Sequence, residues 1–66
     1  MPQITLASNV PAEEFPIDFN IQFTELMAEL LGKPTSRIIL LVMPNAQLSH
    51  GTTRDPSCLI VVCFNH

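Results

Sequence analysis

Charged side chains are scarce in this sequence, and positively charged ones are the scarcest. Charged residues make up 14% of the 66 residues, against about 25% in an ordinary globular protein. The net charge is −3, and the cations are Lys33, Arg37 and Arg54. Nucleic-acid-binding surfaces need clustered lysine and arginine side chains to neutralise phosphates. The sequence therefore argues against a nucleic-acid partner.

Long apolar segments are also lacking. No segment approaches the roughly 18 consecutive apolar residues that predict a membrane-spanning helix. The amino-terminal region lacks the basic stretch and apolar core of a secretory signal peptide. We therefore expect no membrane segment and no signal peptide. Because no low-complexity tract or linker divides the chain, we predict a single small domain over residues 1–66.

Cysteines are too few for a disulfide-stabilised scaffold. Cys58 and Cys63 lie five residues apart in one predicted strand, so they should point to opposite faces, about 16 Å from each other. A disulfide needs Cα atoms within about 7 Å. We predict that both thiols are reduced and lie in the core or in an interface.

A metal site is a weak alternative. Two cysteines with His50 and His66 could ligate zinc in principle. Their spacing matches no recognised zinc motif, and the two thiols should face opposite ways. No base is placed to activate a serine or cysteine nucleophile. We predict no metal and no cofactor.

Three segments predict strands. Residues 3–7 alternate between polar and apolar side chains, which is the period of a strand. Residues 38–43 form a continuous apolar run rich in branched side chains, which predicts a central strand covered on both faces. Residues 58–64 form a second such run and predict the last strand.

The segment between the first two strands predicts an amphipathic helix. It should begin near Glu14 to Pro16, because proline suits the first helical turn and acidic side chains stabilise its positive end. Gly32 should cap the helix, and Pro34 prevents its continuation. The predicted core stripe consists of Phe19, Phe23, Leu26, Met27, Leu30 and Leu31.

This order of elements predicts an α/β fold. Strand, helix and strand form a βαβ unit, so the first two strands should be parallel with a right-handed crossover. The last strand should join the same sheet antiparallel, with the helix on one face. With 47% hydrophobic residues, the other face would expose apolar side chains, which marks an interface. We expect a trimer or a larger ring to cover it.

A candidate catalytic group stands at the start of the sequence. Proline after an initiator methionine is usually exposed by methionine removal, which would make Pro2 a secondary amine. An α-amino group titrates near pH 8 or slightly below, and an apolar site lowers its pKa further. Such an amine suits proton transfer at a carbon next to a carbonyl. The alternative is that Pro2 is merely the second residue of an edge strand.

A set of residues at fixed offsets gives the sequence a family resemblance. It resembles the N-terminal half of the macrophage migration inhibitory factor family, which includes D-dopachrome tautomerase, over nearly the whole chain without gaps. The resemblance rests on Met1-Pro2, Asn9-Val10-Pro11, Phe19, Gly32-Lys33-Pro34, Val42, Pro44, Gly51, Asp55-Pro56 and Cys58.

The resemblance implies a tautomerase fold, in which two βαβ repeats make a subunit and three subunits pack their sheets around a channel. It implies keto–enol tautomerase activity on small aromatic 2-keto acids such as phenylpyruvate, or on dopachrome-like substrates. Pro2 would be the general base. Lys33 would hold the substrate carboxylate, and its charge would keep Pro2 uncharged. The alternative for Lys33 is a lysine that only interacts with the helix dipole.

The same resemblance implies a cytoplasmic protein that also acts outside the cell as a cytokine, through a cell-surface receptor and without a signal peptide.

The sequence departs from the family pattern in four respects. Phe64-Asn65-His66 stands where members read Ser-Ile-Gly, and residue 65 would contact substrate through its backbone. His50 replaces an apolar residue by the pocket, and Val61 replaces a second cysteine. The second repeat is missing.

These departures leave an alternative function open. A truncated, catalytically inactive form could serve as an interaction module, either as a cytokine or by mixing with full-length family members.

Overall fold

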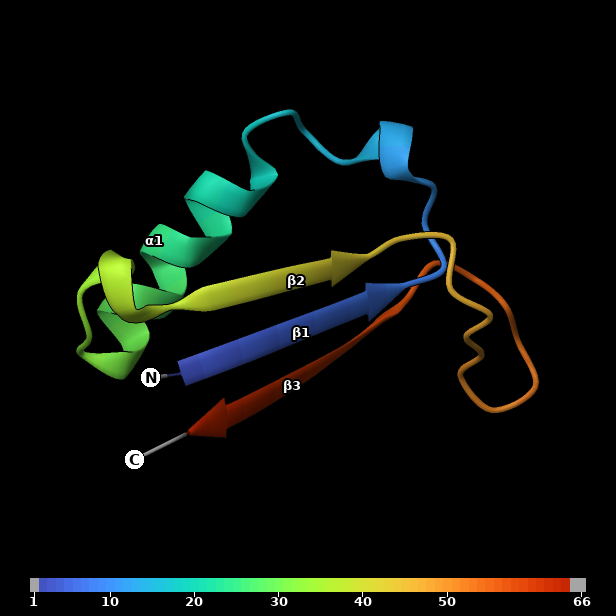
Figure 1. Cartoon of the computed structure of the whole chain (residues 1–66). Coiled ribbons are helices and arrows are strands. Elements are labelled where there is room, and N and C mark those ends of the chain that lie inside the picture. The colour runs from blue at the N-terminus through green and yellow to red at the C-terminus, as the bar shows by residue number, and fades with distance from the viewer. Residues whose placement is uncertain (1, 65–66) are drawn as a thin grey trace.

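The computed structural model describes residues 2–64 as a three-stranded sheet with one α-helix. The strand order is β2-β1-β3, with β1 parallel to β2 and antiparallel to β3 (Figure 1). This confirms the predicted α/β fold, its parallel βαβ unit and its antiparallel last strand. The elements are β1 (Pro2–Ser8), α1 (Phe19–Leu31), β2 (Ile39–Met43) and β3 (Cys58–Phe64), with short 3-10 helices η1 (Ala12–Glu14) and η2 (Thr35–Arg37).

The helix begins later than the sequence predicted. The acidic stretch forms η1 instead, and α1 starts only at Phe19. Pro16 explains the break, because a proline disfavours helical backbone in the residue before it. Phe15 is accordingly extended, with φ −81° and ψ 137°. The predicted cap is confirmed: Gly32 has φ 65° and donates its N–H to the carbonyls of Ala28 and Glu29.

The core lies between α1 and the middle of the sheet. Alternate residues of β1 face the helix and are buried, with Ile4 only 1% exposed and Leu6 4%. Ala28 is the buried residue of α1. Two members of the predicted core stripe were assigned wrongly, because Leu26 is 50% exposed and Leu30 69%. The apolar stripe of α1 is wider than the part of the sheet that lies beneath it.

β2 is not the central strand of the sheet. Residues 38–43 were predicted to form a central strand covered on both faces. The strand is confirmed as β2, but its predicted position was wrong, because β1 lies in the middle of the sheet and β2 at its edge. The alternative that Pro2 belongs to an edge strand was also wrong. The register pairs Ile4 with Leu40, which puts the even-numbered residues of β2 under the helix. Ile39, Leu41 and Met43 point to the other face and are about half exposed.

The uncovered side of the sheet, here called the open sheet face, is apolar. The helix lies against one face only, closest to β2 (Figure 1). The opposite face carries Ile39, Leu41 and Met43 from β2 and Leu59 and Val61 from β3, all roughly half exposed. The sequence prediction of one covered and one uncovered face is therefore confirmed.

Asn9 holds the long loop between β2 and β3. Its amide nitrogen donates to the carbonyls of Arg54 and Asp55, both at 3.0 Å, and to Leu48 at 3.3 Å. Its side-chain oxygen accepts the N–H of Ser57 at 3.0 Å. The adjacent Ser8 donates its hydroxyl to the Ser57 carbonyl at 2.8 Å. These bonds tie the end of β1 to the start of β3.

Across residues 2–64, no helix is long and apolar enough to cross a membrane.

Candidate functional site

Pro2 opens the central strand and is buried on the helix-covered face. A proline lacks the N–H that a strand ladder uses, and the first residue of a strand is where this is tolerated. Phe64, the last residue of β3, is its partner in the antiparallel ladder. Sequence reasoning missed Phe64 as a neighbour of Pro2, because the pairing joins the two ends of the described chain.

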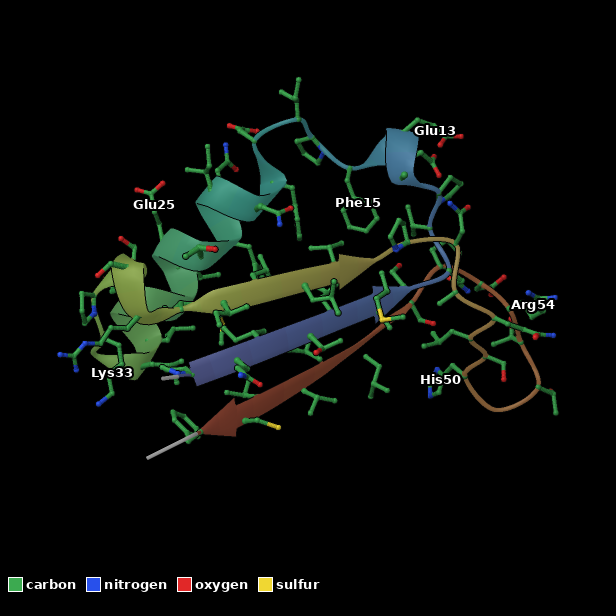
Figure 2. The ribbon with its side chains drawn as sticks, in the orientation of Figure 1. Glu13, Phe15, Glu25, Lys33, His50 and Arg54 are labelled. Carbon is green, nitrogen blue, oxygen red and sulfur yellow. The ribbon has the colours of Figure 1, made fainter. Side chains whose placement is uncertain are left out.

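Lys33 lies just beyond the C-cap of α1. Its backbone N–H donates to the carbonyl of Ala28 at 3.1 Å, which fixes the main chain, while its side chain is exposed. Figure 2 shows Lys33 at the end of the molecule where β1 starts. The fold thus brings the two residues predicted as site residues, Pro2 and Lys33, to one end of the sheet.

The charged groups at this end are few. Lys33 follows α1, Arg37 lies in η2, and Glu29 is exposed on the last turn of the helix. β2 and β3 carry no charged residue. Among residues 2–64, this end of the sheet therefore carries two cations and one anion, although the whole chain is acidic. A site with an excess of cations suits an anionic substrate such as a carboxylate.

His50 lies at the opposite end of the molecule, on the loop that also carries Arg54 (Figure 2). Its backbone forms an isolated bridge with Thr53. Within one chain His50 is therefore remote from Pro2. Three residues that the sequence analysis singled out, Met1, Asn65 and His66, lie outside the described residues.

The two cysteines are free and exposed. Cys58 pairs with Ser8 on the helix-covered side, whereas Cys63 pairs with Gln3 on the other side. The prediction of opposite faces is confirmed, and a place in the core is wrong for this chain. Among residues 2–64, no group of three or more histidine, cysteine or acidic side chains could hold a metal ion.

An apolar cavity of about 390 Å³ opens between α1 and β3. It exists because α1 lies over β2 and β1 and leaves the helix side of β3 bare. The ring of Phe19 lies 5.5 Å from that of Phe23 on the helix flank that borders this cavity. Sequence reasoning assigned both rings to the core and so missed the cavity. The lining residues include Leu6, Phe19, Phe23, Ser57, Cys58 and Ile60.

Comparison with known proteins decides the family. A model of the macrophage migration inhibitory factor family matches residues 1–64. The chain belongs to the macrophage migration inhibitory factor family. This is a family of the tautomerase superfamily, and tautomerase and cytokine functions are known at the level of the family.

Among curated members of the family, the MIF-like protein mif-2 of Caenorhabditis elegans is 42% identical over 62 residues, which cover 94% of this chain and 52% of that protein. Macrophage migration inhibitory factor of Mus musculus is 32% identical over 59 residues, covering 89% of this chain and 51% of that protein. The chain therefore spans about half the length of the curated relatives it matches.

Solved structures of the family agree with the fold. Macrophage migration inhibitory factor from Oncomelania hupensis superposes with a TM-score of 0.84 at 28% identity, covering 91% of this chain and 43% of that one. The factor from Trichinella spiralis gives a TM-score of 0.80 at 30% identity, with coverage of 85% and 50%.

Proposed function

We propose that this chain, in the form that begins at Pro2, catalyses keto–enol tautomerisation with the Pro2 amine as general base. The observation that carries the proposal is the position of Pro2, which is buried at the start of the central strand of a macrophage migration inhibitory factor fold. Burial disfavours the charged form of an amine and lowers its pKa. A base with a pKa near the working pH is effective in proton transfer.

The chemistry moves one proton between two atoms of the substrate. Pro2 accepts a proton from the carbon next to the carbonyl, or from the enol oxygen in the other direction. The resulting prolinium returns the proton to the other end of the enol system. Bond order changes along the C–C–O unit, and no atom is gained or lost. No cofactor enters this scheme.

Lys33 is proposed as the substrate-binding residue. Its ammonium group can pair with the carboxylate of a 2-keto acid through charge-assisted hydrogen bonds. A nearby cation also disfavours protonation of Pro2, so burial and charge act in the same direction on its pKa. The proposed substrates are small aromatic 2-keto acids such as phenylpyruvate, or dopachrome-like compounds.

We further propose that the chain acts as an oligomer, a trimer or a mixed assembly with full-length family members. The accessible surface is 4860 Å², about 700 Å² more than expected for a compact monomer of this mass. One partner in a standard interface contributes about 800 Å². The open sheet face supplies a continuous apolar surface of the kind that interfaces bury.

The decisive experiment measures enol–keto conversion of phenylpyruvate by the processed chain. A Pro2→Gly variant keeps a free amino terminus but loses the ring, and a chain that retains Met1 blocks the amine of Pro2 in a peptide bond. Both should lose activity while their circular dichroism spectra stay unchanged. If the chain that retains Met1 is as active as the processed chain, Pro2 is not the base.

A second candidate function is that of an interaction module without catalytic activity. The exposed apolar surfaces on both sides of β3 favour it, since they need a partner. It predicts co-purification with a full-length family member at micromolar concentration, or binding to a cell-surface receptor.

The proposed location is the cytoplasm, with release from the cell without a signal peptide. Fractionation of cells and medium tests this, and protein confined to cells would contradict release.

A further inference from the structure

One pair of residues joins the first strand to the last at the site end of the sheet. Pro2 and Phe64 face each other in the antiparallel ladder between β1 and β3. Directly opposed residues in such a ladder point to the same face, with Cβ atoms about 4.5–5.5 Å apart. Phe64 therefore lies beside Pro2 on the helix-covered face.

The two partners differ in exposure. Pro2 is buried, whereas Phe64 is 54% exposed. The outer edge of β3 is unpaired within the described residues, so one side of Phe64 faces Pro2 and the rest is open. A half-exposed aromatic ring beside a candidate base can cover that base and still contact a bound molecule.

We propose that Phe64 forms an apolar wall of the Pro2 site, where its ring shields the amine from water and contacts the hydrocarbon part of the substrate. The shielding is inferred from the pairing and from the burial of Pro2, whereas the substrate contact rests on the proposed function. The family resemblance implies serine at this position, so the proposed wall is specific to this chain.

The surrounding charges stay constant when Phe64 is changed. Lys33, Arg37 and Glu29 come from the helix side of the site, and β2 contributes no charged group. Cys63 is the nearest titratable residue on β3, and its partner Gln3 places it on the open sheet face. Among residues 2–64, a change in the pKa of the Pro2 amine on substituting Phe64 therefore reports the loss of the ring and not a change of charge.

The first test is independent of activity. The pKa of the Pro2 amine is measured by NMR titration of the processed chain carrying isotopically labelled proline. Phe64→Ser should raise the pKa by about 0.5 unit or more, because water returns to the charged form. Phe64→Leu should keep it close to the parent value, and Cys63→Ser is the matched control on the opposite face. An unchanged pKa in Phe64→Ser would overturn the shielding.

The second test compares kcat/KM for phenylpyruvate with that for the enol of an aliphatic 2-keto acid. Phe64→Ser should lower the value for the aromatic substrate roughly tenfold, the effect of losing a modest apolar contact, and should change the aliphatic one much less. Equal losses on both substrates would overturn the substrate contact. If the parent chain is inactive, the proposed function fails and the titration alone decides the shielding.

Discussion

The side-chain oxygen of Asn9 accepts a hydrogen bond from the backbone N–H of Ser57 at 3.0 Å, across 48 residues of sequence. This bond joins the residue after β1 to the residue before β3. The amide nitrogen of the same side chain satisfies three loop carbonyls. One side chain thereby fixes where β3 enters the sheet and, at the far end of the ladder, what stands opposite Pro2.

We expect Asn9→Ala to lower the free energy of unfolding by about 2 kcal/mol, because it leaves an N–H and several carbonyls without their partner. Asn9→Asp should cost at least as much, since a carboxylate would face three carbonyl oxygens. Urea denaturation followed by circular dichroism measures both. Asn20→Ala, an exposed asparagine on α1, is the control and should change stability by less than about 0.5 kcal/mol.

The left-handed cap of α1 gives a second prediction. Gly32 has φ 65°, and a Cβ added there would meet no atom within 4 Å. The cost of Gly32→Ala is therefore purely a backbone cost of about 1 kcal/mol. Gly32→Asn should cost less, because asparagine tolerates this conformation. Thermal or urea unfolding measures the difference, and equal costs for the two variants would contradict the explanation.

Lys33 gives a prediction about substrate affinity. We expect Lys33→Ala to raise KM for phenylpyruvate roughly tenfold, the effect of losing about 1.4 kcal/mol of charge-assisted pairing. Lys33→Arg should retain most of the affinity. Arg54→Ala removes one positive charge at the opposite end of the molecule (Figure 2) and serves as the matched control. A similar rise in KM for Arg54→Ala would show that only net charge matters.

The open sheet face gives a prediction about assembly. Leu41 lies on it and is 54% exposed, whereas Ile21 lies on α1 and is 64% exposed. Leu41→Glu should shift the chain toward monomers, because burying an unpaired carboxylate in an interface is costly. Ile21→Glu should leave the assembly unchanged. Sedimentation equilibrium distinguishes the two variants, and dissociation by both would place the interface elsewhere.

Much of the fold could be predicted because its signals are local. Alternation in residues 3–7 and the apolar runs at 38–43 and 58–64 indicated three strands, and Gly32 indicated the end of the helix. The start of the helix was wrong because Pro16 was taken as a helix starter, although it also forces Phe15 into an extended conformation. The assignment of Leu26 and Leu30 to the core was wrong, because a helical stripe does not reveal how wide the surface beneath it is.

The candidate site, like the fold, was only partly predictable from the sequence. Pro2 and Lys33 could be proposed from residue type, position and family resemblance, which need no coordinates. Their presence at one end of the sheet, and the remoteness of His50, depend on how the chain returns after α1 and after β2. The neighbour of Pro2 in β3 could not be predicted, since no local pattern links the first strand to the last.

Local patterns in the sequence thus determined which three segments form strands, where the helix ends and that one face of the sheet is apolar. The tertiary structure decided that β1 is central and that Phe64 stands opposite Pro2. The physical reason is the composition of β3. An uninterrupted apolar strand lacks the polar alternation that specifies register, so hydrogen bonds between the side chains of Asn9 and Ser8 and the backbone of Ser57 are needed to set it.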